Sequence, residues 1–137
     1  MRDWTWIDPR IVEALHDRQL AEHGGPAGLR DPGGLESGLA WARNLSAYGE
    51  PDGAALAAAY AYGIARNHPF VDGNKRTAWI LARLFLALND MQLRYDKGEA
   101  VGIILSLAAG EVSEEELGAW FRERIVAVSG AGRGGKE

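Results

Sequence analysis

One stretch of nine residues, His68 to Arg76, gathers side chains suited to binding and transferring charged groups. It reads His-Pro-Phe-Val-Asp-Gly-Asn-Lys-Arg and holds an imidazole, a carboxylate, an amide and two cations. Histidine is the side chain best suited to accept a proton near neutral pH, so His68 is the candidate general base. A single carboxylate beside phosphate groups is the usual protein share of a Mg²⁺ site, so Asp72 is the candidate metal ligand.

The second half of the stretch predicts an anion-binding loop at the start of a helix. Pro69 disfavours helical backbone at the residue before it, and Gly73-Asn74 forms a tight turn. The first N–H groups of the following helix then lie beside Lys75 and Arg76, where backbone dipoles and two cations attract phosphate. A base, a metal carboxylate and a phosphate loop together indicate transfer of part of a nucleotide to a hydroxyl.

A structural interpretation of the same residues stays open on spacing alone. Asp-Gly-Asn is also a turn sequence, and a lone histidine before a turn is more often structural than catalytic. The sequence contains no cysteine and no His-Glu-x-x-His pattern, which argues against zinc, and no Walker A loop. Phe70, between the base and the carboxylate, is expected to point inward and anchor the loop.

Six helices are expected to position this stretch. Asp-Pro or Pro-Asp pairs open the first three helices, which begin near Pro9, Pro32 and Pro51. The first and third are expected to end near His23 and Asn67. Apolar stripes at helical spacing include Ile11, Leu15 and Leu20 in the first helix and Leu35 and Leu39 in the second.

The fourth helix, from Asn74 to about Asn89, has little polar surface and is expected to be central and buried. Asp96 caps a fifth helix, and Ser113 opens a sixth with Leu117, Trp120, Phe121 and Ile125 inward. Only Met91–Tyr95 and Trp4–Ile7 could be extended. We therefore expect an all-α, six-helix single domain over residues 1–128 and a disordered Gly-rich tail over 129–137.

The composition of the chain bears on its cellular location and on its contacts with nucleic acids and membranes. A chain of 137 residues is one domain, and its net charge of −4 argues against a general nucleic-acid coat. The absence of cysteine fits a reducing cytoplasm. No apolar run reaches the roughly 20 residues of a membrane helix, and the N-terminus has no signal-peptide core. We expect a cytoplasmic protein without direct nucleic-acid or membrane contact.

The nine-residue stretch resembles the signature of the Fic/Doc (Fido) superfamily, His-x-Phe-x-Asp/Glu-Gly/Ala-Asn-Gly/Lys-Arg, at every specified position. The segments Leu15–Asp31, Leu35–Ser37 and Tyr62–Asn67 are similar to the Doc (death-on-curing) branch, so the resemblance spans roughly residues 7–125. It implies that His68 deprotonates the target hydroxyl and Asp72 holds Mg²⁺. It also implies that Phe70 fixes the loop into the core. The implied nucleotide-binding residues are Gly73, Asn74, Lys75 and Arg76.

Two positions favour the Doc branch over the branch that transfers AMP. The AMP-transferring branch usually has glycine at position 75 and a second arginine at position 79, whereas this chain has Lys75 and Trp79. An indole cannot clamp the inner phosphates of a nucleotide. The resemblance therefore implies a kinase that transfers the γ-phosphate of ATP to a threonine of elongation factor Tu and arrests translation.

Two alternatives remain beside the toxin kinase. One is a Fic-type AMP transferase that modifies a protein hydroxyl, and the other is a catalytically silent anion-binding module. We find no Ser/Thr-x-x-x-Glu-Gly/Asn inhibitory helix in the chain, so restraint is expected from a partner. The Doc resemblance implies an antitoxin of the prevent-host-death type, which folds as a helix into a hydrophobic groove.

Overall fold

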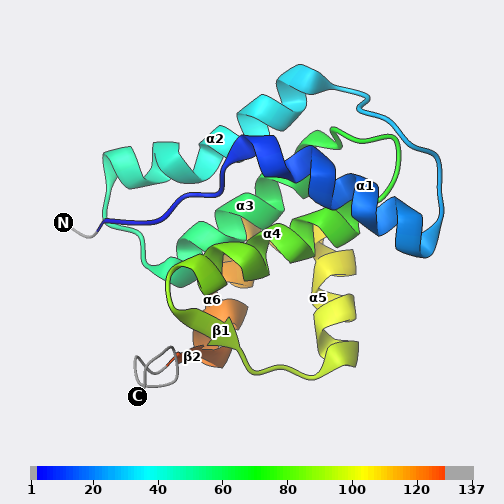
Figure 1. Cartoon of the computed structure of the whole chain (residues 1–137). Coiled ribbons are helices and arrows are strands. Elements are labelled where there is room, and N and C mark those ends of the chain that lie inside the picture. The colour runs from blue at the N-terminus through cyan, green and yellow to red at the C-terminus, as the bar shows by residue number, and fades with distance from the viewer. Residues whose placement is uncertain (1–2, 129–137) are drawn as a thin grey trace, which may run out of the picture.

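The structure, a computed structural model, describes residues 3–128, and the expected disordered tail over 129–137 lies outside these residues. Within the described part the chain forms six α-helices, one short 3₁₀ turn and two three-residue strands (Figure 1). The all-α expectation is confirmed. In chain order the elements are η1 (Pro9–Ile11), α1 (Val12–His23), α2 (Pro32–Tyr48), α3 (Gly53–Asn67), α4 (Asn74–Leu88), β1 (Met91–Leu93), α5 (Lys97–Ala108), α6 (Glu114–Arg124) and β2 (Ile125–Ala127).

Helix α3 is the centre of the fold and packs against α2, α4 and α6. Its sequence is rich in alanine and glycine, which lets neighbouring backbones approach closely. The tightest approach joins α3 to α2, where a Cβ added at Gly38 would lie 2.8 Å from the carbonyl oxygen of Gly63. Only glycine fits at this crossing without displacing one of the two helices.

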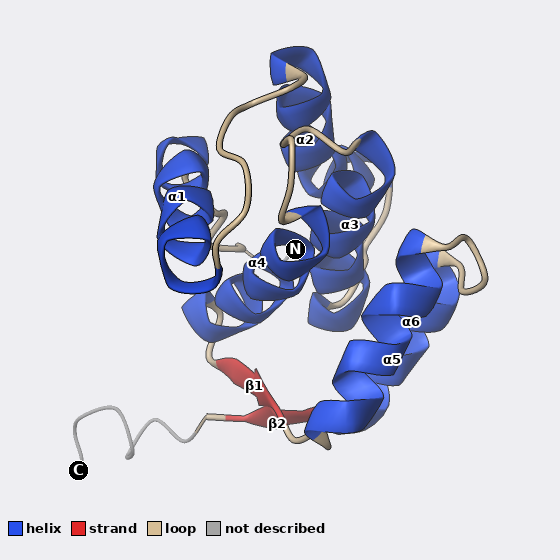
Figure 2. Cartoon of the chain, turned by 90° about the vertical axis from the view of Figure 1, so that its right-hand side faces the viewer, coloured by secondary structure: helices blue, strands red, loops and turns tan. Residues whose placement is uncertain are grey.

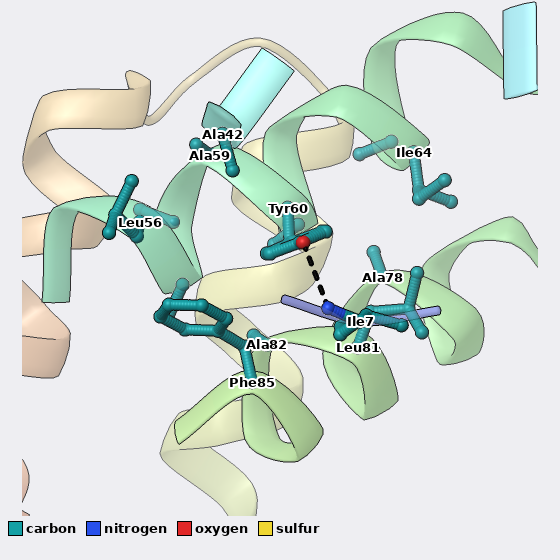
Figure 3. Packing of buried hydrophobic residues seen from close by; sticks show 14 of the residues in the cluster. Ile7, Ala42, Leu56, Ala59, Tyr60, Ile64, Ala78, Leu81, Ala82 and Phe85 are labelled. Carbon is teal, nitrogen blue, oxygen red and sulfur yellow. Dashed lines mark hydrogen bonds between the residues drawn. The ribbon is translucent and has the colours of Figure 1, made fainter. Parts of the chain in front are cut away.

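The N-terminal segment closes the core over α3 and α4 (Figure 3). Ile7 is buried, and its backbone N–H donates to the hydroxyl of Tyr60 at 3.2 Å. Tyr60 packs in turn on Phe85 of α4, with ring centroids 5.3 Å apart. Phe85 and Leu81 are fully buried, whereas Trp79, Ile80 and Leu84 are half-buried. The fourth helix is therefore central as expected, but one of its faces remains accessible.

The first helix and the chain ends differ from the sequence-based expectation. Residues Pro9–Ile11 form a 3₁₀ turn, and the buried stripe of α1 is Val12, His16 and Leu20. Ile11 was expected inward but is exposed. Val12 and His16 take the buried positions expected for Ile11 and Leu15, whereas Leu20 is buried as expected and Leu15 is half-buried. No strand forms at Trp4–Ile7, which is held instead by reciprocal hydrogen bonds between the Thr5 backbone and the Asn89 side chain.

The two strands form a small antiparallel sheet at the edge of the helical domain (Figure 2). Met91 pairs with Ala127 and Leu93 with Ile125. The expectation that Ile125 continues the sixth helix is wrong, because α6 ends at Arg124 and the chain turns extended to pair with β1. No helix within residues 3–128 is long and apolar enough to cross a membrane.

Candidate active site

The nine-residue stretch forms the connection between α3 and α4 together with the first residues of α4, and it lies beside the linker that joins α1 to α2 (Figure 1). Backbone hydrogen bonds tie the two segments together. Arg30 and Asp31 both donate their N–H groups to the carbonyl of Pro69, at 2.7 and 2.9 Å. Val71 donates to the carbonyl of Gly28 at 3.1 Å. The linker therefore acts as a strap, residues 28–31, that holds the loop from outside.

His68 ends α3 in a left-handed backbone conformation with φ 45°. This conformation is uncommon for a residue other than glycine and persists where surrounding contacts enforce it. Its N–H donates to Ile64 at 3.1 Å, and its carbonyl accepts a hydrogen bond from the Arg30 guanidinium. The backbone of His68 is thus fixed from both sides, while its exposed imidazole lines a cleft.

Phe70 and Asn74 give the loop its shape. Phe70 is 1% exposed and lies inside the core. The Asn74 side chain accepts a hydrogen bond from the Phe70 N–H at 3.0 Å and donates to the Phe70 carbonyl at 2.9 Å. Both polar atoms of the Asn74 amide are engaged inside the loop. We therefore expect Asn74 to bind a ligand through its backbone N–H rather than through its side chain.

His16 is a further residue of this site, and the sequence analysis did not assign it a role. It projects from α1, is 1% exposed, and stacks on Phe70 with ring centroids 3.7 Å apart and an interplanar angle of 9°. Its Nε2 donates to the carbonyl oxygen of Asp72 at 2.6 Å. The signal in the sequence was a histidine four residues from both Val12 and Leu20, on the buried face of the helix.

Asp72 presents its carboxylate at the mouth of the loop. One oxygen accepts a hydrogen bond from the Gly73 N–H at 2.8 Å. The other lies against Gly25, where an added Cβ would come within 2.5 Å of it. Gly25 also has φ 116°, so glycine is required there both by space and by backbone conformation. The linker thus leaves a fitted space for this carboxylate.

These residues fit a Mg²⁺ ion that takes most of its ligands from a substrate. Asp72 is exposed and forms no ion pair with a lysine or arginine of residues 3–128. No group of three or more potential ligand side chains occurs in the same residues. Mg²⁺ is commonly held by one or two carboxylates with water and substrate phosphates completing its shell. The donor set matches that arrangement rather than a cage built by the protein alone.

The loop opens into a cleft of about 950 Å³. Four cationic side chains line this cleft: Lys75, Arg76, Arg83 and Lys97. None of the four forms an ion pair with a carboxylate in the part of the chain that the structure describes. Asp72 is the acidic residue in the lining, although the whole chain has a net charge of −4. The cleft therefore concentrates positive charge, which favours a polyanionic ligand.

The structure brings together the residues that the sequence singled out. The imidazole of His68, the carboxylate of Asp72 and the cations Lys75 and Arg76 all line the one cleft, with Gly73 and Asn74 between them. Helix α4 begins at Asn74, so its first backbone N–H groups lie at the same end. Trp79 also lines the cleft, as do residues of α5 that the sequence analysis had not connected with the site.

The fold and this loop define a member of a known family. A family model described as the Fic/DOC family matches residues 6–86, more than half of the chain, and the chain belongs to this family. Two relatives are similar to it. A protein named protein kinase doc, from Escherichia phage P1, is 38% identical over 108 residues, which cover 78% of this chain and 85% of the relative. A protein named toxin Doc, from Mycolicibacterium smegmatis, is 43% identical over 76 residues, covering 53% of this chain and 58% of the relative.

Proposed function

We propose that this protein is a Doc-type toxin kinase that transfers the γ-phosphate of ATP to a threonine hydroxyl of a protein target. The observation that carries the proposal is the cleft at the N-terminus of α4, where an imidazole and a carboxylate meet cations that form no ion pair within residues 3–128. The name of the phage P1 relative, protein kinase doc, supports phosphoryl transfer. The name toxin Doc supports the biological role.

The proposed reaction uses the residues in separate roles. The imidazole of His68 accepts the proton of the target hydroxyl, whose oxygen then forms a bond to the γ-phosphorus. The bond from that phosphorus to the β,γ-bridging oxygen breaks, and ADP leaves. Lys75, Arg76 and the first N–H groups of α4 stabilise the charge on the phosphoryl oxygens. A Mg²⁺ ion held at Asp72 would supply further charge neutralisation for the phosphates.

The choice of the γ-phosphate follows from the charge of the loop. The terminal phosphate is the most highly charged end of ATP, and the loop offers two cations together with helix dipoles. Trp79, one helical turn beyond Arg76, provides no cation for an inner-phosphate clamp. Whichever phosphate occupies the loop lies nearest His68 and is the one attacked.

AMP transfer is the second candidate, and one structural observation favours it. Arg83 lies one turn beyond Trp79 and lines the same cleft, so an arginine is present further along α4. In that reading Arg83 would hold the outer phosphates and the α-phosphate would occupy the loop. The two reactions differ in the group that is added to the target.

Labelled ATP distinguishes the two reactions directly. Purified protein is incubated with elongation factor Tu, the expected target, and ATP labelled at either the γ- or the α-phosphorus. We expect label on the target from the γ position alone, and no label with His68→Ala. Label transferred only from the α position would establish AMP transfer. No transfer from either position, with ATP still bound, would favour the silent anion-binding module for this target.

For the partner we propose an antitoxin of the prevent-host-death type that folds as a helix into a hydrophobic groove. Family membership supports this proposal, as does the toxin name of one relative. Expression of the chain alone should arrest growth, and co-expression of a short neighbouring reading frame should restore it. Arrest that persists with every neighbouring frame would contradict the partner proposal without affecting the kinase assignment.

A further inference from the structure

The cleft continues well beyond the phosphate loop, between one face of α4 and one face of α5. On α4 the lining residues follow helical spacing from Arg76 through Trp79 to Arg83. On α5 the lining residues also share one face: Lys97, Ala100, Val101, Ile104 and Leu105. The catalytic residues described above occupy only one end of this space.

The other end of the cleft, which we call the far end, is formed by Trp79, Arg83 and Tyr95. The ring of Tyr95 meets the indole of Trp79 edge-on, with centroids 5.1 Å apart. The guanidinium of Arg83 lies over the same tyrosine ring, 5.7 Å from its centroid. Both aromatic side chains are only half-buried, so part of each ring faces the cleft. The far end therefore offers flat aromatic and guanidinium surfaces beside the apolar wall of α5.

The spacing of the two ends suits a nucleotide that lies along the cleft. Arg83 is seven residues beyond Arg76, which corresponds to roughly 10 Å along the axis of α4. With the γ-phosphate at the loop, the nucleoside is the part of the same ATP molecule that extends furthest along the cleft. The α5 wall includes Val101 and Leu105, which are 54% and 51% exposed. Apolar side chains suit a base and a ribose better than they suit phosphate oxygens.

We propose that the far end of the cleft is the nucleoside subsite, in which the base of ATP stacks against Arg83 and the exposed ring surface of Trp79 or Tyr95. Stacking on aromatic and guanidinium groups is tolerant of base identity and contributes substantially to nucleotide binding. This inference rests on the proposed function, because the phosphates must occupy the loop at the other end. In this proposal Trp79 contacts the nucleoside, so its role is more than the absence of an arginine at position 79.

Calorimetry with two probes separates the subsite from the phosphate loop. Mg²⁺-ATP and Mg²⁺-tripolyphosphate are titrated into the full chain and into Arg83→Ala. Arg83 is exposed, so the substitution leaves the core intact. The matched control is Arg94→Ala, which removes the same charge from an exposed residue just before Tyr95 that does not line the cleft.

We expect Arg83→Ala to weaken ATP binding roughly tenfold and tripolyphosphate binding by less than about twofold. Arg94→Ala should change neither affinity by more than about twofold. Lys75→Ala should weaken both probes together, because both place a phosphate in the loop. The expected pattern is therefore a selective loss of ATP affinity at the far end and a shared loss at the loop.

Three other results overturn the inference, and they differ from failure of the proposed function. If Arg83→Ala weakens the binding of ATP and of tripolyphosphate equally, phosphates occupy the far end, and the nucleotide lies in the opposite direction along the cleft. Unchanged ATP affinity would show that the far end serves another ligand, such as an acidic peptide of a partner. If the unaltered chain binds tripolyphosphate as tightly as ATP, the nucleoside makes no contact there. If it binds neither probe, the proposed function itself fails.

Discussion

The Nε2 atom of His16 lies 2.6 Å from the carbonyl oxygen of Asp72, joining two residues that are 56 positions apart. The same imidazole stacks on Phe70, so one buried side chain from α1 supports both Phe70 and the Asp72 end of the loop. Hydrogen bonding to Asp72 goes through the backbone, which leaves its carboxylate available to the cleft. The geometry of the loop therefore depends on the position of α1 relative to it.

Loss of His16 should destabilise the fold in two separable ways. We expect His16→Ala to lower the free energy of unfolding by about 3 kcal/mol, because it opens a cavity and leaves a carbonyl without its donor. His16→Phe keeps the stacking surface and loses only the donor, so the loss should be about 1–2 kcal/mol. Chemical denaturation measures both. His23→Ala, at the exposed end of the same helix, should change stability by under about 0.5 kcal/mol. Wild-type stability in His16→Phe would show that the hydrogen bond is unimportant.

Asp72→Asn tests the metal site without changing the size of the side chain. Transfer to the target should fall by roughly a hundredfold or more, because the charge that attracts Mg²⁺ is lost. ATP binding should also lose most of its dependence on Mg²⁺ concentration, which calorimetry measures independently of catalysis. Glu36→Gln, an exposed carboxylate on α2, is the control and should change neither quantity. A wild-type dependence of ATP binding on Mg²⁺ in Asp72→Asn would place the metal elsewhere.

The crossing of α2 and α3 predicts a strong effect of a single methyl group. Gly38→Ala places a Cβ 2.8 Å from the carbonyl oxygen of Gly63, so the helices must separate or strain. We expect a loss of stability of about 2–3 kcal/mol by chemical denaturation. The control is Gly102→Ala in α5, where nothing lies within 4 Å of the added atom. That change should raise stability by up to about 1 kcal/mol, through helix propensity. Equal effects at the two positions would contradict the close approach.

The ion pair between Asp52 and Arg122 links the start of α3 to α6 and predicts a dependence of stability on pH. Arg122 donates two hydrogen bonds to the Asp52 carboxylate, at 2.6 and 2.9 Å, and thereby lowers the pKa of Asp52. Because the folded pKa lies below the unfolded value, this stabilisation is fully present above the unfolded pKa. It is lost as the pH falls through the folded pKa.

Asp52→Asn should therefore lower the free energy of unfolding near neutral pH and have a vanishing effect in acid. The loss should be under about 1 kcal/mol, because both side chains are 52% exposed and solvent screens the pair. Denaturation of both proteins at neutral and acidic pH gives the two differences. Asp96→Asn is the control, since Asp96 caps α5 but pairs with no lysine or arginine of residues 3–128. If the difference in the free energy of unfolding between the two proteins grew at acidic pH, the pKa of Asp52 would not be lowered by folding.

The helices were predictable because their starts are encoded locally. Side-chain caps form at four helix starts that the sequence indicated: Asp31, Asp52, Asp96 and Ser113. Strand β2 was missed because three residues are too few to show alternation, and their pairing depends on β1 more than thirty residues earlier. Local periodicity at the end of α6 gave no reason to stop the helix at Arg124.

The candidate site was predictable only where its residues are contiguous. The stretch from His68 to Arg76 is local, and its members line one cleft as a result. His16 and Arg30 reach the loop from other segments, and Tyr95 reaches the far end of the cleft from the start of the α5 region. These contributions depend on how the helices pack against one another, and the spacing of residues along the chain does not reveal that packing.

The strap at residues 28–31 has a consequence for transplanting the site. The left-handed backbone at His68 is held by the Arg30 guanidinium, and the Pro69 carbonyl is held by two N–H groups of the same strap. A nine-residue cassette grafted between two helices of another scaffold would carry every reactive side chain and none of these restraints. The backbone would relax toward a commoner conformation, and the imidazole would lose its fixed position in the cleft. The portable unit is the loop together with α1 and its linker, so it begins at Val12 rather than at His68.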